Sequence, residues 1–149
     1  ISKVKELAKN IIKLVVITGG EPLRQNISPL CESLLSNGFS VQIETNGTLY
    51  RELTKEVDIV CSPKNTGQGY VPIRNDLLQR VSALKYIISA GNHAYNHVPE
   101  TPHNIPIFVQ PMDEYDAEKN AKNTRLALEL AMLHGYRLSL QMHKILNIE

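Results

Sequence analysis

Two glycines and an acid follow the first apolar run of the chain, and these residue types suit a charged small molecule. The stretch TGGEP spans Thr18–Pro22 and ends the apolar run Leu14–Thr18. Gly19 and Gly20 let a ligand approach the backbone, and their amide groups can donate hydrogen bonds. Glu21 offers a carboxylate that suits an ammonium group. A plain glycine-rich turn between a strand and a helix explains this motif equally well on its own.

Polar residues also follow four other predicted strands. In ETNGT, Glu44 and Asn46 could bind the hydroxyl groups of a sugar, and in SPK, Lys64 provides a cation for a carboxylate. QPMD combines an amide with a soft apolar contact for a flat heterocycle, and the last strand ends in QMHK. Each group can also be read as a turn or a solvated strand end. The candidates at the first three of these ends are Glu44, Asn46, Ser62, Pro63, Lys64, Gln110, Pro111, Met112 and Asp113.

The elements that must position these groups alternate along the chain. Near-continuous apolar runs predict strands that are buried on both faces, as in parallel sheets, and parallel strands bring their carboxyl ends to one edge. An acid, a base, sugar contacts and an apolar slot at one edge would together fit S-adenosylmethionine. The predicted strands are 14–18, 39–45, 58–64, 84–89, 107–111 and 137–142.

The predicted helices follow from apolar spacing and from capping residues. Ser2 is the expected cap of a first helix whose apolar face ends at Ile12, and Asn26 is the expected cap of a second. The longest helix is expected over 116–134, where Gly135 ends it. Shorter helices are expected over 50–57 and 76–81, and a long loop over 90–106.

The composition excludes several classes of function. The chain has 149 residues, 42% hydrophobic and 21% charged, with a net charge of +1. This balance argues against a nucleic-acid or membrane partner and favours a small ligand. No apolar run is long enough to span a bilayer. Two cysteines, Cys31 and Cys61, form no disulfide framework, so a cytoplasmic protein is expected.

The motifs TGGEP, IETNGT, CSPK, FVQPMD and RLSLQMHKILNIE together resemble the 7-carboxy-7-deazaguanine synthase family of radical S-adenosylmethionine enzymes. TGGEP indicates the superfamily, whereas SPK, QPMD and LQMHK indicate the family. The resemblance extends from Leu14 to the end of the chain. It implies an open α/β partial barrel with mostly parallel strands, lacking its first strand, in one domain over residues 1–149.

The resemblance also implies a reaction. Members of the family are lyases that convert 6-carboxy-5,6,7,8-tetrahydropterin to 7-carboxy-7-deazaguanine and release ammonia. The product leads to queuosine, a modified nucleoside of tRNA. The enzymes use S-adenosylmethionine, a [4Fe–4S] cluster and Mg²⁺, and they commonly form homodimers.

The matching motifs assign roles to the candidate residues. Gly19, Gly20, Glu21 and the candidates of ETNGT, SPK and QPMD would bind S-adenosylmethionine. The pterin substrate would contact Thr18, Gln141 and His143, together with Glu149 if it is the native C-terminus.

The chain departs from the family pattern in its cysteines. The family holds its cluster with three closely spaced cysteines, often CxxxCxxC, whereas Cys31 and Cys61 lie thirty positions apart, with no third cysteine. We expect them to be two buried thiols. The chain, which starts with Ile1, would then be about the C-terminal two-thirds of the enzyme, without the cluster, the Mg²⁺ contact or radical activity of its own.

Two other functions remain open. A glycyl-radical activating enzyme shares GGEP, although SPK and LQMHK argue against it. A degenerate S-adenosylmethionine-binding or protein-interaction module would also lack the cluster cysteines. The loop that carries His93, His97 and His103 has a spacing that could suit a metal, but its prolines and glycine favour a surface insertion.

Overall fold

The computed structural model of the chain describes residues 1–102 and 104–148. Two compact units share these residues: unit 1 comprises Ile1–Pro63 and Pro72–Ser82, and unit 2 comprises Lys64–Val71 and Ala83–Glu149. The organisation as a single domain stays a prediction.

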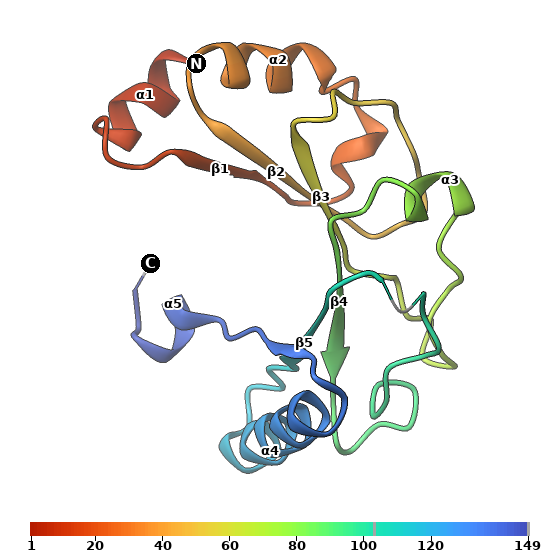
Figure 1. The fold of residues 1–149 in the computed structure, drawn as a ribbon. Coiled ribbons are helices and arrows are strands. Elements are labelled where there is room, and N and C mark those ends of the chain that lie inside the picture. Colours follow the sequence, from red (N-terminus) through yellow and green to blue (C-terminus); the bar gives the residue numbers. More distant parts are fainter. Residues whose placement is uncertain (103, 149) are drawn as a thin grey trace. The chain divides into compact units, whose positions relative to one another are not determined.

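Unit 1 is built on three parallel strands that pair with one another. β2 (Ser40–Thr45) lies between β1 (Leu14–Ile17) and β3 (Val57–Cys61), with Val41 opposite both Val15 and Val57. Its helical elements are α1 (Ser2–Ala8), η1 (Pro22–Arg24), α2 (Ser28–Ser36) and α3 (Asn75–Leu78), labelled in part in Figure 1.

The core of unit 1 lies where α2 and η1 pack on the middle strand. Both elements contact β2, and burial alternates along β2 and β3. Alternation arises because successive side chains of a strand point to opposite faces. The buried apolar side chains include Leu23, Cys31, Leu34, Val41, Ile43, Ile59 and Cys61.

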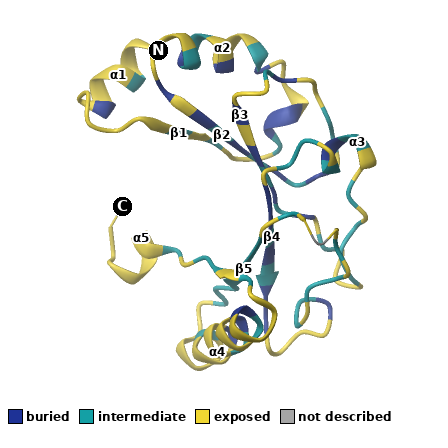
Figure 2. Ribbon diagram, viewed as in Figure 1, coloured by how far each residue is buried: buried dark blue, intermediate teal, exposed yellow. Residues whose placement is uncertain are grey.

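β1 and α1 are more exposed than the sequence predicts. Leu14 and Val16 are exposed, and of the predicted apolar face of the first helix only Ala8 is buried, as the yellow of α1 in Figure 2 shows. In the part of the chain that the structure describes, β1 pairs with β2 alone, so a continuous apolar run here does not mean burial on both faces. α1 ends at Ala8 because Lys9 adopts a left-handed conformation.

The helix predicted over 50–57 is wrong. Residues 49–54 have no regular structure, and side-chain hydrogen bonds connect them to other segments. Arg51 Nε donates to the carbonyl of Leu23 at 2.7 Å, and an Arg80 amino group donates to the carbonyl of Thr54 at 3.1 Å. Since a short helix gains little from its own hydrogen bonds, these contacts decide the conformation.

Two predicted helix caps are also wrong. α1 has Ile1 and α2 has Ile27 at the N-cap, and neither helix has a side-chain cap. Pro29 stands in the first turn of α2, where its missing N–H reduces the need for a cap.

Unit 2 contains three parallel strands that pair with one another. β5 (Ile107–Pro111) lies between β4 (Ala83–Ile88) and β6 (Arg137–Leu138). The long helix α4 (Ala117–His134) packs against all three strands. Its predicted end is confirmed, and its predicted start is one residue early: the Asp116 side chain accepts from the Lys119 amide as the N-cap, and Gly135 ends the helix at a φ of 71°. The described part of the loop over 90–106 contains no helix or strand, as predicted.

The last predicted strand is shorter than expected. β6 has two residues, and the chain then forms α5 (Met142–Ile145). The Ser139 amide still donates to the carbonyl of Val109 at 2.9 Å. The next hydrogen bond of a parallel ladder would run from the amide of residue 111 to Ser139, and Pro111 has no N–H. The sheet therefore stops at Ser139.

No helix in the described part of the chain has the length and the apolar character that a membrane crossing requires.

Candidate functional site

The backbone that follows β1 is exposed and has a conformation that only glycine adopts easily. Gly19 has a φ of 91° and Gly20 a φ of 48°, and a Cβ at either position would meet no atom within 4 Å. Glycine is therefore required by conformation here and leaves open space beside the backbone. Thr18 is exposed as well. The open space beside Gly19 and Gly20 leaves room for a ligand to approach the turn, as predicted.

The Glu21 carboxylate joins the exits of β1 and β2. Its Oε1 accepts from Thr45 Oγ1 at 2.7 Å and from the Leu23 amide at 3.1 Å, and its Oε2 accepts from the Asn46 amide at 2.8 Å. Since a carboxylate offers about four acceptor positions, about one remains for a ligand. The main role of Glu21 in unit 1 is therefore structural, and the ammonium contact stays a prediction.

The ends of β2 and β3 lie beside this carboxylate. The Ser62 amide donates to the carbonyl of Thr45 at 2.8 Å, which extends the ladder to the start of SPK. Asn46 Oδ1 accepts from the amide of Thr48 at 3.0 Å and from its hydroxyl at 2.7 Å, so the turn interpretation of ETNGT is correct for that oxygen. Glu44 is half-buried on β2, and Pro63 is buried.

Gly47 is the glycine that packing requires in unit 1. Its φ is 80°, and a Cβ there would lie 2.8 Å from the sulfur of the buried Cys61. We expect Gly47→Ala to lower the free energy of unfolding by about 2–4 kcal/mol, because it adds backbone strain and a collision in the core. Urea unfolding followed by circular dichroism measures the loss.

Gly38→Ala is the matched control. Gly38 has nearly the same φ, 78°, but nothing lies within 4 Å of its added Cβ. This variant should lose only the left-handed strain, about 1 kcal/mol. Equal losses in the two variants would show that the contact with Cys61 is unimportant.

Neither cysteine is placed to bind a metal. Cys31 lies on α2 and Cys61 on β3, and both are buried and free. Burial raises the pKa of Cys31, and burial, with a smaller effect of the Glu21 charge, raises the pKa of Cys61 to about 12. Both side chains therefore stay protonated thiols, whereas a cluster needs thiolates. The expectation of two buried thiols is confirmed.

In unit 2, Lys64 begins a loop whose side chains form two hydrogen bonds to backbone carbonyls of other segments. Asn65 Nδ2 donates to the carbonyl of Ala94 at 2.5 Å, and the Tyr70 hydroxyl donates to the carbonyl of Ile87 at 2.5 Å. The Tyr70 ring meets Tyr86 edge-on, with centroids 4.9 Å apart. Burial raises the pKa of Tyr70, so its hydroxyl remains a donor. The Lys64 side chain itself is exposed, as a ligand contact requires.

A cavity of about 310 Å³ opens at the carboxyl end of β5. Four predicted site residues line it, three from QPMD and one from the last strand. Gln110 does not line it; its Oε1 accepts from Ser139 Oγ at 3.3 Å. His143 is exposed and does not line it either, and Glu149 lies outside the described residues. The lining residues are Pro111, Met112, Asp113, Asn120, Thr124, Leu140, Gln141, Lys144 and Ile145.

Asp113 is held by three partners. Its Oδ1 accepts from the Tyr115 amide at 3.0 Å and from Asn120 Nδ2 at 2.9 Å, and its Oδ2 pairs with Lys144 Nζ at 2.6 Å. The hydrogen bond from Lys144, together with the other two, lowers the pKa of Asp113 to about 2. The turn interpretation of Asp113 is therefore correct, and its carboxylate is charged at neutral pH.

This shift predicts how the contacts of Asp113 respond to acid. Because the folded pKa is about 2 and the ordinary value is 3.8, their stabilisation is complete above about pH 4 and is lost as the pH falls toward 2. Titration of the Asp113 carboxyl carbon by NMR should give a midpoint near 2. The midpoint should rise in Lys144→Gln, and an unchanged midpoint there would contradict the assigned cause.

The residues that fix the end of β5 were not predicted from the sequence. Asn123, buried on α4, donates to the carbonyl of Met112 and to Glu114 Oε1, both at 3.0 Å, and accepts from the Ala90 amide at 2.7 Å. The buried Ser89 donates to the same Glu114 oxygen at 2.9 Å. The hydrogen bonds that Glu114 accepts from Asn123 and Ser89 lower its pKa. One signal was available: Asn123 precedes Ala127 and Ala131 at the spacing of a buried helix face.

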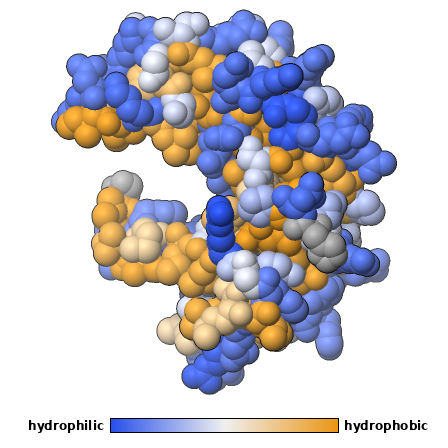
Figure 3. All heavy atoms as spheres, in the orientation of Figure 1, coloured by the Kyte–Doolittle hydropathy of each residue, from blue (hydrophilic) through white to orange (hydrophobic). Residues whose placement is uncertain are grey.

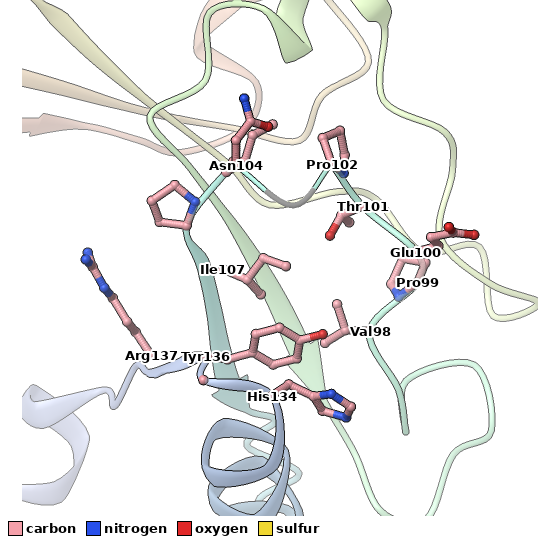
Figure 4. Close-up of a pocket in the computed structure, with 13 residues that line it drawn as sticks. Val98, Pro99, Glu100, Thr101, Pro102, Asn104, Ile107, His134, Tyr136 and Arg137 are labelled. Atoms are coloured by element: carbon pink, nitrogen blue, oxygen red, sulfur yellow. The ribbon is translucent and has the colours of Figure 1, made fainter.

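A larger cavity, of about 540 Å³, lies at the amino ends of β5 and β6 (Figure 4). Its lining includes Ile107 and Arg137, the first residues of these strands. The rings of His134 and Tyr136 stack there, with centroids 5.1 Å apart. Since no candidate residue lines this cavity, it is not part of the predicted site.

The histidine loop shows local contacts. Nδ1 of His93 and Nδ1 of His97 each lie beside the side-chain amide of Asn96, at 3.3 and 3.0 Å, and His103 lies outside the described residues. Over the described ranges, no three His, Cys, Asp or Glu side chains are grouped to hold a metal ion.

Comparison with known proteins finds close relatives. A 7-carboxy-7-deazaguanine synthase of Rickettsia prowazekii is 54% identical over 157 aligned residues, covering 100% of this chain and 67% of the relative. Those of Rhodospirillum rubrum and Escherichia coli K12 are 38% and 34% identical, and the chain covers 66% and 60% of their lengths. The chain thus spans about two-thirds of the curated relatives it matches. No family model matches it.

Solved structures give the same result. The crystal structure of QueE from Escherichia coli matches 94% of this chain and 61% of its own length, with a TM-score of 0.71 and 29% sequence identity. The parallel pairing within both units and this match confirm the predicted fold class, an α/β partial barrel with mostly parallel strands.

Proposed function

The chain belongs to the family of 7-carboxy-7-deazaguanine synthases, and we propose that it supplies the S-adenosylmethionine- and pterin-binding part of such an enzyme. The observation that carries the proposal is the 54% identity to a synthase over the whole chain. The reaction would be the radical conversion of 6-carboxy-5,6,7,8-tetrahydropterin to 7-carboxy-7-deazaguanine with release of ammonia.

The geometry of each unit supports this assignment. In unit 1 the turn of Gly19 and Gly20 leaves open space beside exposed backbone, next to the Glu21 carboxylate. In unit 2 a cavity with an apolar wall of Pro111 and Met112 opens at the end of β5. Such a slot suits a flat heterocycle, and Gln141 adds a polar group at its rim. Glu44, Asn46, Ser62 and Lys64 remain proposed contacts of S-adenosylmethionine.

The residues of this chain do not fit a [4Fe–4S] cluster. The sequence has two cysteines, both are buried thiols, and they lie on a helix and a strand. S-adenosylmethionine supplies the radical in this family, and a cluster held elsewhere would have to activate it. We therefore propose that these 149 residues bind ligands but lack radical activity on their own.

Three further parts of the proposal follow from the family. The active protein would be a homodimer, would use Mg²⁺ and would work in the cytoplasm as a step toward queuosine. As the resemblance implies, the Mg²⁺ contact would come from the part of the enzyme that carries the cluster cysteines. Sedimentation equilibrium of the purified chain tests the homodimer.

Lys64→Ala tests the ligand site. The Lys64 side chain is exposed, so its removal should leave the fold intact. We expect calorimetric titration to show binding of S-adenosylmethionine to the wild type and about tenfold weaker binding to Lys64→Ala, the loss of one charge-assisted hydrogen bond.

Lys55→Ala is the control, because Lys55 is also exposed but does not belong to any of the candidate motifs. It should bind like the wild type. Absence of binding in the wild type would contradict the proposed function, and equal binding in Lys64→Ala would remove Lys64 from the site.

A further inference from the structure

The C-terminal segment reaches the cavity of unit 2 with little burial of its own. α5 has no buried residue, and its apolar side chains Met142 and Ile145 are exposed, as are Leu146 and Ile148 after it. Figure 3 shows this segment as hydrophobic surface. The sheet hydrogen bonds end at Ser139, because Pro111 cannot donate. Another contact must therefore hold the segment in place.

That contact runs through Lys144. Its Nζ pairs with Asp113 Oδ2 at 2.6 Å and lies 5.5 Å from the centre of the Tyr115 ring. Among the described residues, Lys144 is the α5 residue whose side chain hydrogen-bonds to a residue outside α5. Asp113 is in turn fixed by Asn120 of α4 and by the Tyr115 amide, so Lys144 meets a rigid acceptor.

The same residue is bonded directly to Gln141. The Lys144 amide donates to the carbonyl of Gln141 at 2.9 Å, and the Ile145 amide donates to that carbonyl at 3.2 Å. Asp113, Lys144 and Gln141 all line the cavity. Lys144 therefore connects two walls of the cavity. Its side chain bonds to Asp113 at the end of β5, and its backbone amide bonds to Gln141 on the other wall.

We infer that Lys144 is a positioning residue, and that its ion pair with Asp113 holds α5 over the cavity and sets Gln141 at the rim. Lys144 acts through Gln141 and Asp113 and is not itself a ligand contact. The role of the ion pair in holding the segment stands on this geometry alone, whereas the identity of the ligand rests on the proposed function.

Two variants and a matched control test the inference. Lys144→Gln removes the charge, and Lys144→Arg keeps it and should restore the contact. Lys122→Gln is the control, because Lys122 also forms a 2.7 Å ion pair in unit 2, with Glu118 on the exposed surface of α4. All three variants are made in the full chain.

Hydrogen exchange measures whether the segment is held. In Lys144→Gln we expect the amides of residues 141–148 to exchange about fivefold faster, because their docked state loses its tether. Lys144→Arg and Lys122→Gln should stay within about twofold of the wild type, as expected for retained or remote surface pairs. Unchanged exchange in Lys144→Gln, or an equal increase in Lys122→Gln, would overturn the inference.

Calorimetric titration of 6-carboxy-5,6,7,8-tetrahydropterin, the substrate assigned to Gln141, gives the second measurement. Binding should weaken by about three- to tenfold in Lys144→Gln and recover in Lys144→Arg, since only the charged residues keep Gln141 in place. If exchange changes as expected while no protein, wild type included, binds the ligand, the tether stands and the proposed function fails. If the wild type binds and Lys144→Gln binds equally well, the positioning role fails and the proposed function stands.

Discussion

Glu21→Ala should lower the free energy of unfolding of unit 1 by about 3–5 kcal/mol, one of the two largest effects we expect in this chain. The variant removes the acceptor of three hydrogen bonds, from the Thr45 hydroxyl and the amides of Leu23 and Asn46. Thr45 is buried, so its hydroxyl would lose the acceptor of its proton without access to water. Urea unfolding measures the loss, and hydrogen exchange shows whether it is confined to unit 1.

Two further variants separate the causes. Glu21→Gln keeps the shape but replaces one acceptor oxygen with a donor, so we expect about half of the loss. Glu32→Ala removes an exposed carboxylate of α2 and should change stability by less than about 0.5 kcal/mol. A loss in Glu21→Ala no larger than that of Glu32→Ala would show that the three hydrogen bonds do not stabilise the exits of β1 and β2.

Asn123→Leu should have an effect of similar size in unit 2, about 3–4 kcal/mol. The new side chain has a similar volume, but it leaves the Ala90 amide, the Met112 carbonyl and one Glu114 oxygen without the partner that Asn123 provides. The Asn123 side chain is almost fully buried, so water cannot replace these bonds. Thermal unfolding of the variant should show a lower midpoint.

Asn37→Leu provides the same chemical change at an exposed position. Asn37 ends α2 and donates one hydrogen bond, to the carbonyl of Ser33 at 2.7 Å. It should lose about 1 kcal/mol or less. If Asn123→Leu is as stable as Asn37→Leu, the buried amide does not hold the end of β5.

The strands and the longest helix were predictable because they rest on local signals. Asp116 and Gly135 mark the ends of α4 through capping chemistry that the sequence displays, and β5 was predicted with its observed bounds. The predicted helix over 50–57 failed because Arg51 and Arg80 bond to backbone from distant segments. Hydrogen bonds of that kind have no periodic pattern in the sequence.

The candidate site was predictable in its residue types but not in its partners. Motif resemblance selected Glu21 and Asp113, and both occupy strand exits as expected. Their carboxylates, however, bond to Thr45, Asn120 and Lys144, which lie 24, 7 and 31 positions away. Pairings over such separations depend on the packed fold, so the sequence alone could not show that both acids are already engaged.

Pro111 has a consequence beyond the length of β6. On one side of β5 the ladder continues, because the Met112 amide donates to the carbonyl of Ile88 at 2.8 Å. On the other side the imino acid offers no donor, so pairing with the last strand ends there and the chain is released to form α5. Any other amino acid at position 111 has an amide hydrogen and would let β6 lengthen toward Gln141. Gln141 would then pair with β5 instead of lining the cavity. Because Pro111 lacks an amide hydrogen, the residues before Ser139 belong to the sheet, whereas Gln141 lies outside the sheet and lines the cavity.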